Sequence, residues 1–263
     1  MNALEAAGRD FLSLTERTPW AAEVPSCPGW RLDDLTRHLG NVHRWAERHV
    51  RERLPDGAPV PEEAPPPAEL TDWFGAGLDA LVAALRAADD DLECFRFFPE
   101  PPGARAFWAR RQAHETTVHL MDARLAAGRP PLPVPVALAL DGIDEYLTGF
   151  HARPRSRVRS AEPRVLALRA DGADGTGAAD GTGAADEARE TAEAGAGREW
   201  TIHLTDDPPR TLREPAARFD CRVSGPATEL YATLWNRLPL GETALRVEGD
   251  ERIMELWRTE GAV

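Results

Sequence analysis

The sequence contains no lysine: all 31 of its basic residues are arginine, and 44 acidic residues outnumber them. The formal net charge of -13 leaves no positive excess that would attract nucleic acid or anionic lipid, so neither is expected as a partner. The arginine bias, together with abundant alanine, glycine, proline and aspartate, indicates a GC-rich genome and says little about chemistry.

Cysteine and long apolar runs are also scarce. Cys27, Cys94 and Cys221 form no Cys-x-x-Cys pair, and their odd number favours thiols in a reducing compartment over a disulfide framework. The first residues, MNALEAAGRDFLSL, contain no basic segment followed by a long apolar one, and no run of about 18 uncharged apolar residues occurs anywhere. These absences predict a soluble, cytoplasmic protein.

The N-terminal half has the pattern of successive helices. Apolar residues recur at helical spacing, as Leu35, Leu39, Val42 and Val50 do in one segment, and proline or glycine follows several of the segments. The proline-rich residues 54–67 are expected to form a loop that crosses between two helices. The predicted helices span residues 2–18, 32–53, 69–88, 104–127 and 134–150.

From about residue 155 the sequence changes to short runs of alternating or apolar character, typical of strands. The expected strands are PRVLALRA, REWTIHL, RFDCRVSG and TALRVEG, and the expected helices are ATELYATLWNRL and DERIMELW. Strands and helices mixed without βαβ regularity indicate an α+β fold, and two domains are predicted, residues 1–153 and 154–263. Residues 171–198 hold an imperfect glycine- and alanine-rich repeat without core-forming side chains, and we expect a disordered insertion there.

The helix predicted over residues 104–127 carries polar residues along one stripe. Glu115 and His119 lie four residues apart and Asp122 follows three later, so on a helix they share one face. His114 precedes His119 by five residues and lies about 140° off that face. A carboxylate and an imidazole one turn apart are able to hold a divalent cation if a third ligand comes from elsewhere.

The second predicted helix offers three histidines as that third ligand. His38 lies on its apolar stripe, whereas His43 is about 140° away around the helix and His49 is about 16 Å further along its axis. The favoured ligand set is therefore His38, Glu115 and His119, with a fourth position open as in catalytic zinc sites of helical bundles. Spacing alone equally allows a buried histidine beside a salt-bridged Glu–His pair that binds no metal.

Two longer stretches resemble a known family. PSCPGWRLDDLTRHLGNVHRWA and FWARRQAHETTVHLMDARLAAG are similar to the mycothiol-dependent maleylpyruvate isomerase family, including Trp30 eight residues before His38 and the Glu115–His119 pair. VSGPATELYATLWNRL, which contains Arg237, and RVEGD resemble the second domain of that family. The resemblance covers nearly the whole chain and implies an α+β multidomain protein, with an N-terminal DinB-like four-helix bundle and a smaller C-terminal α+β domain.

The resemblance also implies a chemistry. It implies that His38, Glu115 and His119 bind a divalent metal, zinc in the first place with nickel or cobalt as alternatives, and that Arg237 serves the active site. Mycothiol is implied as a thiol cosubstrate that attacks a small electrophile as the thiolate. Isomerisation from cis to trans would return the thiol and S-transfer would leave it attached, with Arg237 stabilising a carboxylate or a developing enolate in both. The chain is expected to be a monomer or a homodimer.

Two other function classes stay open at this point. A non-catalytic metal-binding or regulatory protein would hold the metal without affinity for a thiol. A metal-assisted hydrolase would activate water at the open position and turn over without any thiol.

Other residues near the predicted ligands have simpler interpretations. Asp122 either holds a metal-bound imidazole or is an exposed acid near a helix end, and Arg111 is expected to pair with Glu115. Trp30 is interpreted as a packing residue, and Cys27 is not expected to be catalytic because no sequence neighbour is cationic enough to activate its thiol. We interpret the remaining histidines as structural or surface residues: His43, His49, His114, His151 and His203.

Overall fold

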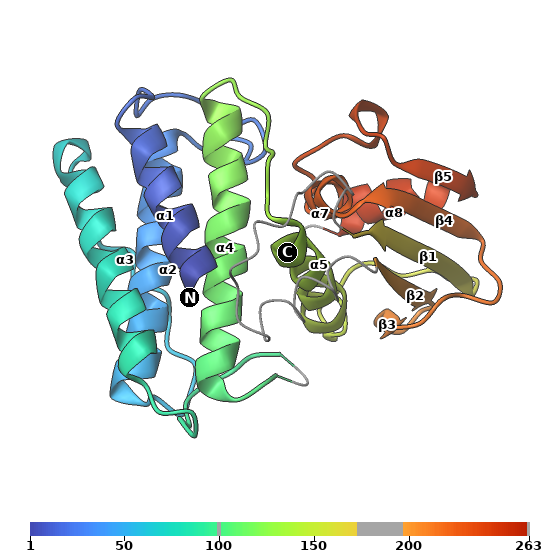
Figure 1. Cartoon of the computed structure of the whole chain (residues 1–263), viewed down its shortest axis with the longest axis horizontal. Coiled ribbons are helices and arrows are strands. Elements are labelled where there is room, and N and C mark those ends of the chain that lie inside the picture. The colour runs from blue at the N-terminus through green and yellow to red at the C-terminus, as the bar shows by residue number, and fades with distance from the viewer. Residues whose placement is uncertain (99–100, 173–196, 262–263) are drawn as a thin grey trace, which may run out of the picture. The chain divides into compact units, whose positions relative to one another are not determined.

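The computed structural model describes residues 1–98, 101–172 and 197–261, and the chain divides into two compact units, Met1–Pro131 and Leu132–Val263 (Figure 1). Unit 1 is helical, whereas unit 2 combines a five-stranded sheet with helices, so the predicted α+β fold is confirmed. The insertion predicted at residues 171–198 lies outside the described residues except at its two ends. Among the described helices, none is both long and apolar enough to cross a membrane.

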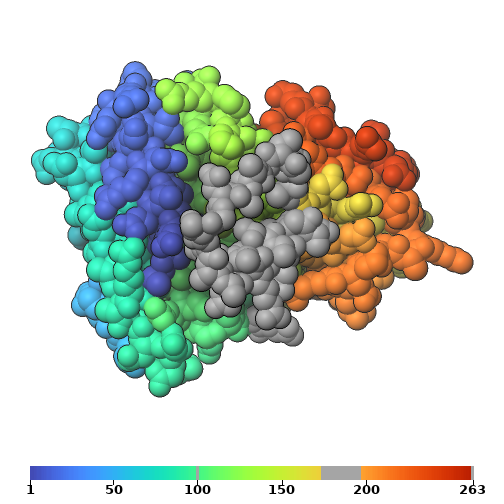
Figure 2. Space-filling model, viewed as in Figure 1, coloured from blue at the N-terminus to red at the C-terminus, as the bar shows by residue number. Residues whose placement is uncertain are grey.

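Unit 1 is a bundle in which apolar faces of four helices meet. The rings of Phe11 and Phe74 lie 4.9 Å apart in its core, centroid to centroid. Figure 2 shows the helix of residues 2–15 (blue) beside that of residues 70–87 (cyan). The Arg86 guanidinium donates a hydrogen bond to the Glu5 carboxylate at 2.6 Å. All four helices were predicted from the sequence, although the first was expected to continue to residue 18 and ends at Thr15. They are α1 (Asn2–Thr15), α2 (Leu32–Glu52), α3 (Leu70–Ala87) and α4 (Ala104–Ala126).

Helix α4 packs against α1 and α2 and also contacts α3. Its buried residues include polar side chains such as Thr116 and Asp122 as well as apolar ones such as Trp108. In the predicted polar stripe Asp122 is buried, and Glu115 and His119 are partly buried, so the stripe is not a fully solvated surface. Buried polar groups need partners within the protein, and α2 supplies several of them.

The loop between α2 and α3 is held by hydrogen bonds to the end of α2. The Ala58 amide donates to His49 Nε2 at 3.3 Å, so His49 Nδ1 carries the proton that it donates to the Trp45 carbonyl at 2.8 Å. The Trp45 indole donates in turn to the Ala58 carbonyl at 2.6 Å. His49 therefore has the structural role expected of it.

Unit 2 contains a sheet in the order β3-β2-β1-β4-β5, antiparallel except where β1 pairs with β4. Four of the strands were predicted, and β3 was not, because three residues are too few to establish an alternating pattern. The strands are β1 (Arg164–Asp171), β2 (Arg198–Leu204), β3 (Arg210–Leu212), β4 (Cys221–Pro226) and β5 (Arg246–Gly249). The helices are α5 (Val136–Glu145), continued by a π-helical turn (Tyr146–Phe150), α7 (Ala227–Leu234) and α8 (Arg252–Glu260).

The division between the units falls after Pro131, earlier than the sequence-based boundary after residue 153. The difference comes from α5, which packs against α7 within unit 2. The Tyr146 ring that follows α5 lies 4.5 Å from the Trp235 ring, centroid to centroid, and its hydroxyl donates to the Gly261 carbonyl. An apolar stripe predicts that a helix is buried on one face, and it does not identify the core that buries it.

Candidate metal centre

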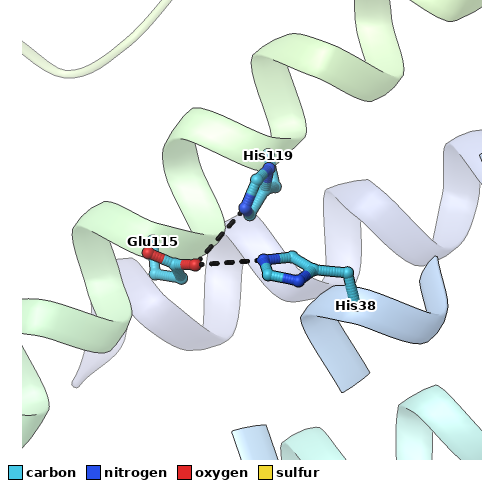
Figure 3. A group of neighbouring side chains, drawn as sticks. All are labelled: His38, Glu115 and His119. Atoms are coloured by element: carbon cyan, nitrogen blue, oxygen red, sulfur yellow. Dashed lines mark ion pairs between the residues drawn. The ribbon is translucent and has the colours of Figure 1, made fainter. Parts of the chain in front are cut away.

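Helices α2 and α4 bring His38, Glu115 and His119 together (Figure 3). Glu115 Oε1 lies 3.6 Å from His38 Nε2 and 3.3 Å from His119 Nε2. The two imidazole rings are nearly perpendicular, at 81°, with centroids 5.0 Å apart. One ligand atom from each residue lies within 4.8 Å of the other two, so the three residues converge on one point.

These separations fit a single divalent cation. Ligand atoms of a tetrahedral zinc site lie about 3.3 Å apart, because each is about 2.0 Å from the metal. The distance of 3.3 Å between Glu115 Oε1 and His119 Nε2 matches that value, and the distance of 3.6 Å between Glu115 Oε1 and His38 Nε2 is slightly longer. Two imidazole nitrogens and a carboxylate oxygen suit zinc and other borderline divalent ions. The side chains are 36% exposed for His38, 21% for Glu115 and 12% for His119, which leaves solvent access from the His38 side.

Arg111 orients the Glu115 carboxylate. Its side chain is 2% exposed, and its guanidinium donates to Glu115 Oε2 at 3.0 Å, one helical turn away, as the sequence predicted. The other oxygen, Oε1, faces the two histidines. Burial alone would raise the pKa of the Glu115 carboxyl, but hydrogen bonds with His119 and His38, together with the charges of His119 and Arg111, hold it well below its usual value. Glu115 is therefore ionised and available as a ligand at neutral pH.

Asp122 contacts the far side of the His119 ring. Its carboxylate is completely buried, and Oδ2 accepts a hydrogen bond from His119 Nδ1 at 2.8 Å. Of the two interpretations of Asp122, the exposed acid is thus excluded. Burial alone would lower the pKa of His119, but hydrogen bonds with Asp122 and Glu115 raise it to about 9. Without a metal the imidazole is protonated at neutral pH, so metal binding would release that proton.

Two residues near the histidines come from the turn that precedes α2. The Trp30 ring stands at 62° to the His38 ring with centroids 5.1 Å apart. Trp30 is therefore a packing residue, as predicted, and it packs on one of the predicted metal ligands. The Ser26 hydroxyl donates to Asp122 Oδ1 at 2.5 Å. Ser26 was not predicted from the sequence, because a serine within a turn rich in proline and glycine has no periodic relation to a helix elsewhere.

The other histidines of unit 1 lie apart from the cluster. His43 is fully buried, and its Nε2 is 2.9 Å from the Thr116 hydroxyl. Burial lowers the pKa of His43 to about 3, so this imidazole is neutral throughout the physiological range. His114 is buried on α4, and its ring does not belong to the group of converging ligand atoms found in the described part of the chain.

Arg237 lies in unit 2, just after α7. The Arg237 amide donates to the Ala232 carbonyl at 2.8 Å, and Asn236 before it has a left-handed backbone with φ of 60°. The Arg237 guanidinium donates through Nη1 to the Trp235 carbonyl at 2.7 Å. Burial raises the pKa of the Tyr146 hydroxyl, and the positive charge of Arg237 acts in the opposite direction. The backbone turn around Asn236 holds the Cα atom of Arg237, and so the start of its side chain, in a defined position.

Comparison with known families accounts for both units. Residues 1–124 match the family model of the mycothiol maleylpyruvate isomerase N-terminal domain, and residues 137–255 match the model of the MDMPI C-terminal domain, which bears the abbreviated name of the same enzyme. The chain belongs to the mycothiol-dependent maleylpyruvate isomerase family. No curated protein sequence matches the chain.

Two solved structures share the fold. A crystal structure of the mycothiol-dependent maleylpyruvate isomerase is similar with a TM-score of 0.51 and 11% sequence identity, over 94% of this chain and 90% of that one. A crystal structure of a histidine-to-alanine variant of the mycothiol-dependent maleylpyruvate isomerase is similar with a TM-score of 0.50 and 11% identity, over 90% of this chain and 87% of that one. At this identity the likeness establishes the fold.

Proposed function

We propose that the protein is a mycothiol-dependent isomerase that converts maleylpyruvate, or a small electrophile of the same kind, from the cis to the trans isomer. The reaction would take place at a divalent metal bound by His38, Glu115 and His119. The observation that carries the proposal is the convergence of these three side chains in a bundle that matches the family model along its length. The similarity to the solved isomerase over both units supports it.

The ligand set suits an anionic sulfur ligand. A divalent metal, when bound, lowers the pKa of a coordinating thiol and so supplies the thiolate, the nucleophilic form of sulfur. Two neutral imidazoles and one carboxylate leave such a site with one net positive charge, which favours a thiolate over a neutral ligand. Arg111 keeps the Glu115 carboxylate aimed at the histidines while the cosubstrate exchanges.

Isomerisation needs a reversible addition. The thiolate sulfur bonds to one carbon of the activated cis double bond, and the electron pair moves to the carbonyl oxygen as an enolate. The former double bond is then single and rotates. Return of the electron pair expels the thiolate and leaves the trans double bond, so the thiol is not consumed.

We assign Arg237 the stabilisation of the substrate carboxylate or of the enolate. A guanidinium remains charged at every physiological pH and pairs with a carboxylate through two parallel hydrogen bonds. The turn around Asn236 holds the backbone of Arg237 in one conformation, which supports a fixed position for the start of this side chain.

Turnover of maleylpyruvate by the zinc-loaded protein tests the proposal. We expect the cis substrate to disappear and the trans product to form, followed by NMR, only when mycothiol is present and without net loss of the thiol. Consumption of one thiol per substrate would identify S-transfer instead. Turnover without any thiol would indicate hydrolysis, and no turnover with bound zinc would indicate a binding protein; both would contradict the proposal.

A further inference from the structure

We propose that Asp122 is a positioning residue that fixes the His119 imidazole for metal binding, and that Ser26, from the turn before α2, holds Asp122 in place. The inference rests on the metal centre of the proposed function. It concerns residues of this chain that surround the ligands and do not touch the metal themselves.

The hydrogen bond between Asp122 and His119 determines which nitrogen faces the metal. An ionised carboxylate only accepts hydrogen bonds, so the Nδ1 atom at 2.8 Å from Asp122 Oδ2 must carry its proton. The lone pair of the metal-binding form is then on Nε2, the atom that lies 3.3 Å from Glu115 Oε1. Because Asp122 is completely buried, water does not compete for this bond. Such partners orient a metal-bound imidazole and increase its basicity.

The Asp122 carboxylate is itself held from a distant part of the sequence. The Ser26 hydroxyl donates to Oδ1 at 2.5 Å, and the Cys27 thiol lies 3.6 Å from Oδ2. Each of these contacts joins the turn before α2 to α4 across more than ninety residues of sequence. Rotation of the carboxylate away from His119 would therefore also disturb the hydrogen bonds with Ser26 and Cys27.

The turn that carries Ser26 is closed by its own backbone. The Cys27 amide donates to the Val24 carbonyl at 2.9 Å, the Trp30 amide to the Cys27 carbonyl at 3.0 Å, and the Val24 amide to the Trp30 carbonyl at 2.9 Å. Since the Trp30 ring also packs on His38, this one turn contacts one histidine directly and the other through Asp122. The turn therefore couples the orientations of the two imidazoles.

The test compares zinc affinity among variants of the full chain. Asp122→Asn keeps the shape of the side chain and removes its charge, and we expect zinc to bind about 10- to 100-fold more weakly. Ser26→Ala should weaken zinc binding by about fivefold, the effect of one lost hydrogen bond, and Ser26→Thr should restore it. Asp72→Asn, an equivalent change at an exposed position of α3, should have no effect. Competition with a chromophoric chelator measures each dissociation constant.

A second readout separates positioning from simple stabilisation. In the zinc-loaded protein the His119 Nδ1–H proton should exchange slowly with water and give its own NMR signal, which Asp122→Asn should shift or broaden. If Asp122→Asn lowers only the melting temperature, with zinc affinity and the Nδ1–H signal unchanged, Asp122 merely joins the turn to α4 and the inference is wrong. If Asp122→Asn does not fold, equal zinc affinity of Ser26→Ala and Ser26→Thr would overturn it. Failure of the unsubstituted protein to bind zinc would instead contradict the metal centre itself.

Discussion

Replacing His119 by alanine is expected to reduce zinc binding by at least about 100-fold and to bring thiol-dependent turnover to the background level. The substitution removes one of three converging ligand atoms and leaves the buried carboxylate of Asp122 without its imidazole partner. Two protein ligands bind zinc more weakly than three, because water then takes the position of the lost ligand. Metal analysis after dialysis, together with the turnover assay, measures both effects.

His38→Ala should give the same loss of zinc with a smaller loss of stability, since the His38 side chain is 36% exposed whereas that of His119 is 12% exposed. His203→Ala, the same chemical change on β2 of unit 2, is the matched control and should keep its zinc. Unchanged metal content in both His38→Ala and His119→Ala would contradict the assignment of the ligands. Circular dichroism of each variant excludes unfolding as the cause.

Replacing Arg237 by methionine is expected to lower kcat/KM for the substrate by about 100- to 1,000-fold, the usual cost of removing a group that stabilises developing negative charge. Methionine keeps much of the apolar length of the side chain and removes its charge. Arg237→Lys should recover only part of the activity, because an ammonium cannot pair with a carboxylate through two parallel hydrogen bonds. Steady-state kinetics with maleylpyruvate as the varied substrate measure these effects.

The effect of Arg237→Met should be confined to the substrate. Zinc content and the affinity for mycothiol should stay at the values of the unsubstituted protein, because the proposed ligands belong to unit 1. Arg246→Met, an exposed change on β5, is the control and should leave kcat/KM unaltered. Equal kcat/KM for Arg237→Met and the unsubstituted protein would remove Arg237 from the proposed reaction.

Helical periodicity was enough to predict the elements that carry the candidate site. The spacing of Glu115 and His119 placed them on one face of a helix, and the angle to His43 and the axial distance to His49 favoured His38 over both. The structure brings these three residues together, with His43 bonded to Thr116 and His49 bonded into a loop. Angles on a helix are fixed by its geometry, so they are readable without a tertiary structure. Whether the cluster binds a metal stays a prediction.

Other features depend on contacts that local sequence does not encode. Ser26 meets Asp122 across 96 residues, and nothing in the turn around Ser26 signals that contact. Similarly, the apolar stripe of α5 predicted a buried helix but not its place in unit 2, which is decided by packing against α7. In both cases the contacting segments are far apart in the sequence, so only the complete fold determines which of them meet.

Calorimetric titration of mycothiol into the zinc-loaded protein tests whether the metal centre binds a thiol. We expect saturable binding at one site, with about one proton released per thiol, because the bound form is the thiolate. Repeating the titration in buffers of different ionisation enthalpy measures that proton. Binding should disappear in the metal-free protein and in His119→Ala. Mycothiol that binds equally well with and without zinc, or that does not bind at all, would contradict the proposed thiol-binding metal centre.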